Sequence, residues 1–272
     1  MVPCDGRLES RDEIPEPHHH NRYDYSPITA RPRFDWPNGN RLAFYVALNV
    51  EHFTFGGGLG HTPTTLGPPP DPRNFAWREY GLRVGLWRIA DVLDAAGIKA
   101  TIALNALVCE HYPKAMEEMK KRGWEFMGHG TTNSESLVGL NLEKERETIG
   151  LVLKTIEQST GTKPRGWLGS GLAETYNTLD ILAEEGVLYC GDWNADDQPF
   201  PMKVKSGRLY SIPYCMEIND IGLYMRKGYT GEQYYRSVMD QFETLYADSE
   251  KQPRVMGIPL HPMISGQPLR IK

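Results

Sequence analysis

The stretch "RLAFYVALNV" at residues 41–50 decides the fold class, because it is a nearly unbroken apolar run of strand-forming residues. A strand without polar alternation is typical of a parallel sheet that helices cover on both faces. Further short apolar runs alternate with helical patterns along the rest of the chain, and this alternation predicts βαβ units. About seven strands are expected, so the sequence favours an incomplete, distorted (β/α) barrel of the α/β class over an open sheet.

The alternation predicts a definite order of elements. The further strands are expected at residues 98–104, 124–128, 164–169, 187–191, 208–214 and 254–260. The helices are expected at residues 82–96, 112–123, 141–161, 176–186 and 232–247. Apolar residues repeat at helical spacing in the first of these helices, and Gly97 is expected to end it. Residues 56–72 are too rich in Gly and Pro for a regular element and are expected to form a long loop over the site.

The first forty residues differ in composition from the rest of the 272-residue chain. Residues 1–40 carry many Pro, Arg and Asp residues without a clear period, so we expect an arm that wraps the domain or a neighbouring subunit. A polar arm of this kind persists most easily when it is docked, which favours a homo-oligomer. Residues 41–272 are expected to form the catalytic domain.

Charge and hydropathy limit the partners and the location of the protein. The net charge of −5 argues against nucleic acid as a main partner. No stretch approaches the roughly 18 consecutive apolar residues of a membrane span, and the N-terminal "MVPCDGRLES" lacks the regions of a signal peptide. We therefore expect a cytoplasmic protein that acts on a small molecule, without membrane attachment.

Polar residues follow the expected strands at five places, and they predict a functional site. In parallel α/β folds, ligands bind where the carboxyl ends of the strands meet. The residues that follow these strand ends are Glu51 with His52, His129, Ser170 between two glycines, Asp192 with Trp193, and His261. A carboxylate directly after an apolar strand is costly to bury without a partner, and the two glycines beside His129 allow a close approach of backbone or ligand.

Each of these residues also has a purely structural interpretation. Glu51 could be a solvated loop acid, and His52 could be a core histidine bonded to the backbone. Asp192 could bind turn amides, while Trp167 and Trp193 could belong to the core. A single polar strand end would mean little, but five of them at one face favour a site.

The order of these motifs resembles the polysaccharide deacetylase superfamily, whose carbohydrate esterases remove N-acetyl groups. The family's first motif is an apolar strand that ends in Thr-Phe-Asp-Asp-Gly. The stretch "ALNVEHF" at residues 47–53 is similar to it, with Glu51 and His52 in the two acidic positions. The resemblance runs from about residue 41 to the end of the chain and implies a polysaccharide deacetylase-like fold for residues 41–272.

Two further motifs carry the resemblance. The stretch "GHGTTNS" at residues 128–134 is similar to Gly-His-Ser/Thr-x-x-His, with Asn133 where the second metal-binding His belongs. Leu260 and His261 match the motif in which a strand ends in Leu-His. A family helix that would close the fold after this motif has no counterpart in the few residues beyond His261, so a C-terminally shortened fragment is one interpretation.

A closer resemblance is to cofactor-independent allantoinases and related cyclic-imide hydrolases. The stretches that carry it are "RFDWPNGNRLAFYVALNVE" at 33–51, "GWLGSG" at 166–171, "LYCGDWNADDQPF" at 188–200 and "IPYCMEIND" at 212–220. This branch also has a Glu in its first motif and a site that can function without the full metal triad. The allantoinase pattern has an Arg near residues 169–171, which this chain lacks, so allantoin itself is not favoured as the substrate.

If a metal were bound, the resemblance implies His52, His129 and Asn133 as its ligands. Two imidazoles and an amide oxygen make a weak, neutral set with no carboxylate to hold the ion. The sequence therefore favours a site without a cofactor, and zinc or another divalent metal is the alternative.

The expected reaction is hydrolysis of a non-peptide carbon–nitrogen bond in a small cyclic amide, imide or ureide. Glu51 is expected to be the general base, with a pKa raised by burial. His129 and His261 are expected to act as electrophile and acid. Trp167, Ser170, Trp193 and Asp192 are expected to bind the substrate. The alternatives are a metal-dependent N-deacetylase of acetylated sugars or peptidoglycan and a catalytically inactive binding module.

Overall fold

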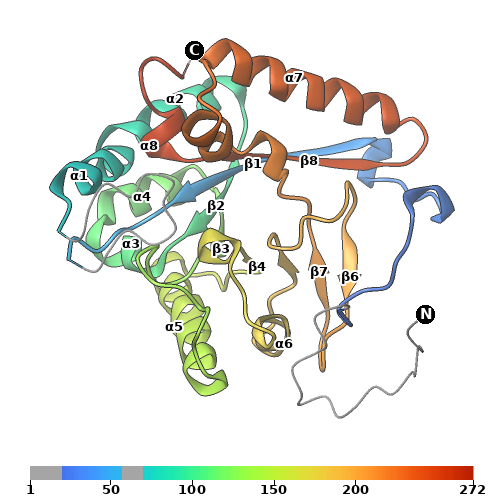
Figure 1. The fold of residues 1–272 in the computed structure, drawn as a ribbon, viewed down its shortest axis with the longest axis horizontal. Helices are drawn as coiled ribbons and strands as arrows, with labels where there is room; N and C mark the ends of the chain where they lie inside the picture. Colours follow the sequence, from blue (N-terminus) through green and yellow to red (C-terminus); the bar gives the residue numbers. More distant parts are fainter. Residues whose placement is uncertain (1–19, 57–69, 272) are drawn as a thin grey trace, which may run out of the picture.

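The computed structural model describes residues 20–56 and 70–271, and an eight-stranded sheet forms its centre (Figure 1). The strands are β1 (Leu42–Val50), β2 (Ala100–Leu104), β3 (Glu125–Gly128), β4 (Gly166–Trp167), β5 (Tyr189–Cys190), β6 (Phe200–Met202), β7 (Leu209–Ser211) and β8 (Arg254–Leu260). The helices are α1 (Pro72–Tyr80), α2 (Leu86–Ala96), α3 (Ala106–His111), α4 (Pro113–Lys121), α5 (Leu142–Thr160), α6 (Thr178–Glu184), α7 (Gly231–Asp248) and α8 (Pro262–Ser265). Residues 1–19 of the expected arm and residues 57–69 of the expected loop lie outside the described residues.

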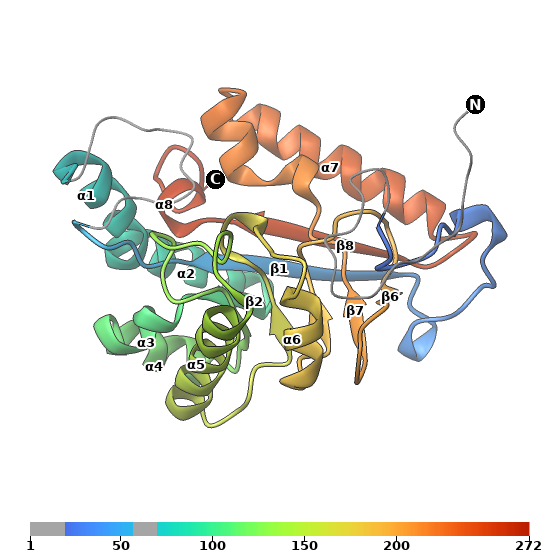
Figure 2. The ribbon, with the colours of Figure 1, turned by 60° about the horizontal axis from the view of Figure 1, so that its bottom comes forward.

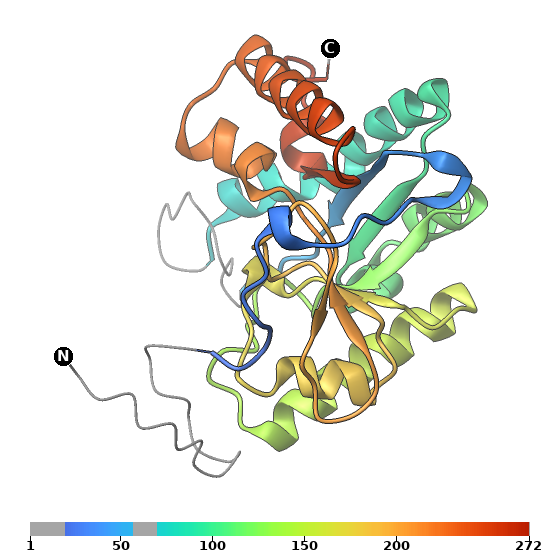
Figure 3. The same cartoon turned by 90° about the vertical axis from the view of Figure 1, so that its right-hand side faces the viewer.

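The sheet is curled and open, with the strand order β6-β7-β5-β4-β3-β2-β1-β8. All neighbouring strands in it are parallel except β6 and β7, which pair antiparallel. Figure 3 shows the strands fanning into a half-barrel whose two edges do not meet. The expected incomplete, distorted (β/α) barrel is confirmed, with seven parallel strands in the described residues and one antiparallel edge strand, β6, that the sequence did not predict.

Helices cover both sides of the long central strands. In Figure 2, α7 and α8 lie on one side of β1 and β8, and α4 and α5 lie on the other. The main hydrophobic core fills the space between the sheet and the second group of helices. Leu48 of β1 is fully buried there, while its neighbours Ala47 and Asn49 are buried against the opposite face of the curled sheet. Burial on both faces explains why β1 shows no polar alternation.

The register of the parallel strands places their ends at one edge. Val50 pairs with Leu104, Leu104 pairs with Gly128, and Gly128 pairs with Trp167. On the other side of β1, Leu48 pairs with Leu260. The residues that follow β1, β2, β3, β4 and β8 therefore start from nearly the same level, which is where the sequence predicts the site.

The described part of the N-terminal arm packs on the domain of its own chain. Arg31 Nη1 donates to Asp196 Oδ1 at 2.8 Å, and Trp36 Nε1 donates to the carbonyl of Arg254 at 3.1 Å. The rings of Tyr23 and Phe200 lie 4.8 Å apart in an edge-to-face arrangement. The arm thus wraps its own domain, whereas a contact of the arm with a second subunit stays a prediction. Within residues 20–56 and 70–271, no helix is both long and apolar enough to cross a membrane.

Gly85 allows a close contact that fixes the C-terminal helix. It lies at the end of a π-helical segment, Gly81–Gly85, and a Cβ atom at this position would stand 2.0 Å from the carbonyl oxygen of Pro262 in α8. We expect Gly85→Ala to lower the free energy of unfolding by about 1–3 kcal/mol, the usual cost of overpacking. Gly150→Ala in α5 is the matched control, because its nearest neighbour would be 3.9 Å away.

The control should be neutral or stabilise the protein by roughly 0.5–1 kcal/mol, since Ala is the better helix former. Urea unfolding of both variants beside the wild type gives the two free energies. Equal stabilities for the two variants would contradict the proposed tight contact between Gly85 and α8.

Candidate active site

Glu51 lies at the centre of the polar residues that follow the strands. Its side chain is 6% exposed, and its Oε1 atom lies 3.5 Å from His129 Nε2 and 3.7 Å from His261 Nε2. The amide nitrogen of Asn133 donates a hydrogen bond to the same oxygen. The structure therefore brings together the three residues that the sequence predicts as catalytic, together with Asn133.

The orientation of the Asn133 amide follows from a second asparagine. Asn105, directly after β2, donates from Nδ2 to Asn133 Oδ1 at 3.2 Å and to the carbonyl of His129. Its own Oδ1 accepts from the backbone nitrogen of His52 at 2.9 Å. Because the Asn133 oxygen faces Asn105, its NH₂ group faces Glu51 and favours the ionised carboxylate. The sequence analysis did not single out Asn105.

His261 forms a pair with a fully buried carboxylate, Asp220. His261 Nδ1 lies 2.6 Å from Asp220 Oδ1, while the backbone nitrogen of His261 and the hydroxyl of Ser265 donate to Oδ2 at 2.7 and 2.6 Å. Burial lowers the pKa of His261, but the charges of Asp220 and Glu51 and the Asp220 hydrogen bond outweigh burial, so the pKa is raised above 6.5. His261 therefore keeps its second ring proton to higher pH than an ordinary histidine does.

His129 is fixed from its other side by the backbone. Its Nδ1 lies 2.6 Å from the carbonyl of Leu168, and a carbonyl only accepts, so Nδ1 carries a hydrogen. The hydroxyl of Ser170 donates to the His129 carbonyl at 2.7 Å. Nε2 faces Glu51 and makes no hydrogen bond within the described part of the chain.

The pKa of Glu51 is lowered, which corrects the expectation from the sequence. Burial alone raises this pKa, but the charges of His261, His129 and Arg78 and the close contact with the His129 ring together lower it below 4.5. The sequence-based argument considered burial without these partners. Glu51 is consequently ionised near neutral pH and ready to accept a proton.

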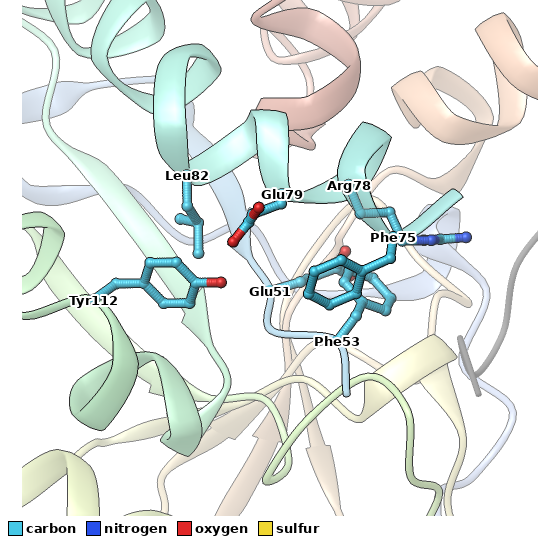
Figure 4. A pocket seen from close by; sticks show the side chains of 7 residues that line it. All are labelled: Glu51, Phe53, Phe75, Arg78, Glu79, Leu82 and Tyr112. Atoms are coloured by element: carbon cyan, nitrogen blue, oxygen red, sulfur yellow. The ribbon is translucent and has the colours of Figure 1, made fainter. Parts of the chain in front are cut away.

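A small hollow lies beside Glu51 (Figure 4). The residues that line it are Glu51, Phe53, Phe75, Arg78, Glu79, Leu82 and Tyr112. Figure 4 shows the Tyr112 hydroxyl pointing towards Glu79 across the hollow, with Phe75, Phe53 and Arg78 grouped beside Glu51. The hollow is thus lined by aromatic rings and by charged side chains of both signs.

Trp167 does not line the site. The sequence-based prediction that it binds substrate is wrong, because its side chain is completely buried in the main core. A Cβ atom on Gly128 would stand 2.6 Å from the Trp167 ring, so the ring fills the space that this glycine leaves. Ser170, also predicted to bind substrate, supports the backbone of His129.

Asp192 and Trp193 are bonded to their own chain. The Asp192 carboxylate accepts from the backbone nitrogen of Gly169 at 2.8 and 3.1 Å. Burial and the neighbouring Glu174 raise the pKa of Asp192 well above its ordinary value. Trp193 Nε1 donates to Glu174 Oε2 at 2.7 Å, and its ring meets that of Tyr23 from the arm. These contacts hold the arm and the loop after β5, so a role in substrate binding stays a prediction.

Comparison with known proteins gives the family of this arrangement. The polysaccharide deacetylase model matches residues 79–190. A Schizosaccharomyces pombe (strain 972 / ATCC 24843) protein named as a polysaccharide deacetylase is 26% identical over an alignment of 280 positions. The alignment covers 90% of this chain and 85% of that protein. The chain carries a polysaccharide deacetylase domain.

Solved structures agree with this family. The structure of Puue allantoinase is 26% identical, with a TM-score of 0.78 over 92% of this chain and 88% of that chain. A structure from Pseudomonas aeruginosa PAO1, also named as a polysaccharide deacetylase, is 25% identical, with a TM-score of 0.79 over 89% of this chain and 85% of that one. These similarities support a hydrolase of the polysaccharide deacetylase type, which acts on carbon–nitrogen bonds other than peptide bonds.

The side chains that the resemblance implies as metal ligands contact other groups in the hydrolase. His52 Nδ1 lies 3.1 Å from the hydroxyl of Thr132, and the His52 ring stacks on that of His111 at 4.9 Å. Asn133 turns its oxygen towards Asn105 and its NH₂ group towards Glu51. Among residues 20–56 and 70–271, no three His, Cys, Asp or Glu side chains group to hold an ion. In this arrangement the side chains of His52 and Asn133 are engaged with Thr132, Asn105 and Glu51, and the choice between no cofactor and zinc stays a prediction.

Asp220 gives a test of the electrostatics that needs no substrate. We expect Asp220→Asn to lower the pKa of His261, because the substitution removes the adjacent negative charge but keeps a side chain of similar shape. NMR titration of the His261 ring measures this pKa. Asp94→Asn is the control, since Asp94 pairs with Arg122 on the surface and should leave His261 unchanged. A His261 titration that is the same in Asp220→Asn and wild type would contradict the pairing.

Proposed function

We propose that this hydrolase opens a small cyclic amide, imide or ureide and that it does so without a tightly bound metal. The observation that carries the proposal is the buried Glu51 carboxylate between His129 and His261, with the Asn133 amide donating to it. Asn133 occupies the position where the family places a metal-binding His. An amide that donates to the base holds the base in place but contributes no ligand.

The arrangement supports a complete hydrolytic cycle. Glu51 takes a proton from water, and the water oxygen bonds to the substrate carbonyl carbon. His129, whose Nε2 lies 3.5 Å from Glu51 Oε1, keeps the carboxylate in position. The carbon–nitrogen bond then breaks as His261, protonated beside Asp220, gives its proton to the leaving nitrogen. The proton on Glu51 afterwards restores His261, so the enzyme ends the cycle in its starting state.

The lining of the hollow supports a flat, ring-shaped substrate. Phe53, Phe75 and Tyr112 supply aromatic walls for such a ring. The name of the allantoinase structure, a solved structure similar to this chain, agrees with a ring-opening reaction.

The alternative function is a metal-dependent N-deacetylase of acetylated sugars or peptidoglycan. The family model and the names of the S. pombe and P. aeruginosa proteins favour it. It would need donors from outside the described residues or a rearranged His52. A cytoplasmic location, a homo-oligomer, a small-molecule substrate and the absence of a nucleic-acid partner remain part of the proposal.

Metal analysis combined with a substrate panel separates the two functions. We expect untagged protein to contain less than stoichiometric zinc and to open dihydrouracil, hydantoin or succinimide at a rate that chelators do not change. Acetylated glucosamine oligomers should not be deacetylated. Stoichiometric zinc together with chelator-sensitive deacetylation would overturn the proposal in favour of the alternative.

Glu51→Gln tests the base. We expect turnover to fall by about two to four orders of magnitude, the usual effect of removing a positioned general base, while the fold is retained because the amide has nearly the same shape. If Glu51 instead has only a structural role, the variant will melt at a lower temperature but keep turnover within a few-fold. Melting temperature and turnover measured on one preparation distinguish the two.

The pH profile of the wild type tests the roles of Glu51 as base and His261 as acid. Glu51 acts as the carboxylate and has a lowered pKa, so activity should be lost only as pH falls through a value below 4.5. His261 acts as the protonated acid and has a raised pKa, so activity should be lost as pH rises through a value above 6.5. The acid limb should vanish in the residual activity of Glu51→Gln.

A further inference from the structure

Arg78 is a buried cation, and together with Glu51 it lines the hollow. It lies in α1, a helix that the sequence analysis did not predict. We propose that the Arg78 guanidinium binds the carbonyl oxygen of the scissile amide and stabilises the negative charge that forms when water adds. The proposal rests on the proposed ring-opening function and names the group that meets the oxyanion.

The reaction creates a charge that the site must compensate. Addition of water converts the carbonyl oxygen into an oxyanion beside a carboxyl group that has just been protonated. Donors or cations aimed at this oxygen commonly contribute a large part of the rate enhancement. Among the described residues that line the hollow, Arg78 is the one cation. His261 is needed for the leaving nitrogen, so it cannot serve the oxygen throughout the cycle.

The guanidinium is held in place before any substrate binds. Its carbon lies 4.3 Å from the centroid of the Phe53 ring, and its Nε donates to Asn74 Oδ1 at 3.2 Å. Asn74 is fixed in turn, because its backbone nitrogen donates to the capping carboxylate of Asp71 at 3.0 Å. A cation that is already oriented loses little entropy when the oxyanion forms.

The charge of Arg78 also acts on the base and the acid. It contributes to the lowered pKa of Glu51, and it opposes the rise in the pKa of His261. Both catalytic groups are therefore within electrostatic reach of the guanidinium. A purely structural Arg78, which only joined α1 to Phe53 and Asp71, would affect stability and leave turnover almost unchanged.

Turnover of the cyclic amides and imides named above forms the first arm of the test. We expect Arg78→Gln to lower kcat by about 10²–10³-fold, the effect of losing an oxyanion-binding group. Arg78→Lys should recover only part of the loss, because an ammonium keeps the charge but lacks the planar fork. Millimolar guanidinium should restore activity to Arg78→Gln more than sodium does. Arg73→Gln is the matched control, because Arg73 is an exposed arginine in the same helix.

Acetate binding forms the second arm, and it needs no substrate. Acetate stands in for the oxyanion, and the Glu51→Gln background removes the repulsion between two carboxylates. We expect acetate to shift the NMR signals of the His129 and His261 rings in this background. Adding Arg78→Gln should weaken the binding by about tenfold or more, as for the loss of a charge-assisted contact. Adding Arg73→Gln should leave the binding unchanged.

The two arms separate failure of the inference from failure of the proposed function. If the wild type opens the rings and Arg78→Gln does so at a rate within about threefold of the wild type, the role of Arg78 is overturned and the proposed function stands. If the wild type opens none of the rings but acetate binding depends on Arg78, the proposed function is overturned and Arg78 remains an anion-binding residue. Acetate binding that is absent from Glu51→Gln, or equal with and without Arg78, would overturn the inference.

Discussion

The negative charge of Glu51 is the constraint on which the site depends. Burying an ionised carboxylate costs several kcal/mol unless donors and cations compensate for the lost water. Here the compensation comes from segments far apart in sequence: the Asn133 amide after β3, His261 after β8 and Arg78 in α1. These groups meet only when the parallel strands are in register. The register of the parallel strands therefore positions the groups that stabilise the Glu51 carboxylate.

The sequence predicted the part of the site that follows directly from this register. Glu51, His129 and His261 each come immediately after an apolar strand, and parallel strands end at one edge. The helix that ends at Gly97 was predicted for a similar reason, because a left-handed residue is most easily a glycine, and Gly97 has a φ of 65°. Local sequence patterns were sufficient to predict a residue's place wherever a single strand or helix determines it.

The rest depends on contacts that leave no local pattern. Asp220 meets His261 from an irregular segment 41 residues earlier, and Arg78 enters from a helix with little apolar periodicity. Trp167 was misplaced because β4 has only two residues, too few to show which side chain faces the core. The pKa of Glu51 is likewise lowered by His261, His129 and Arg78 acting together, and these three residues come from separate segments. It could therefore not be predicted from the sequence at one strand end.

Asn133 determines which kind of positive charge this site can use. Its amide donates to Glu51 and accepts from Asn105, so it orders the base without bringing any charge of its own. Under the proposed function, the positive charge comes from side chains, namely a protonated His261 and the guanidinium of Arg78. Such groups polarise a carbonyl less strongly than a divalent ion does. The proposed metal-free site would consequently act on a strained or doubly activated amide, such as a ring imide or ureide, more readily than on an unactivated acetamide on a sugar.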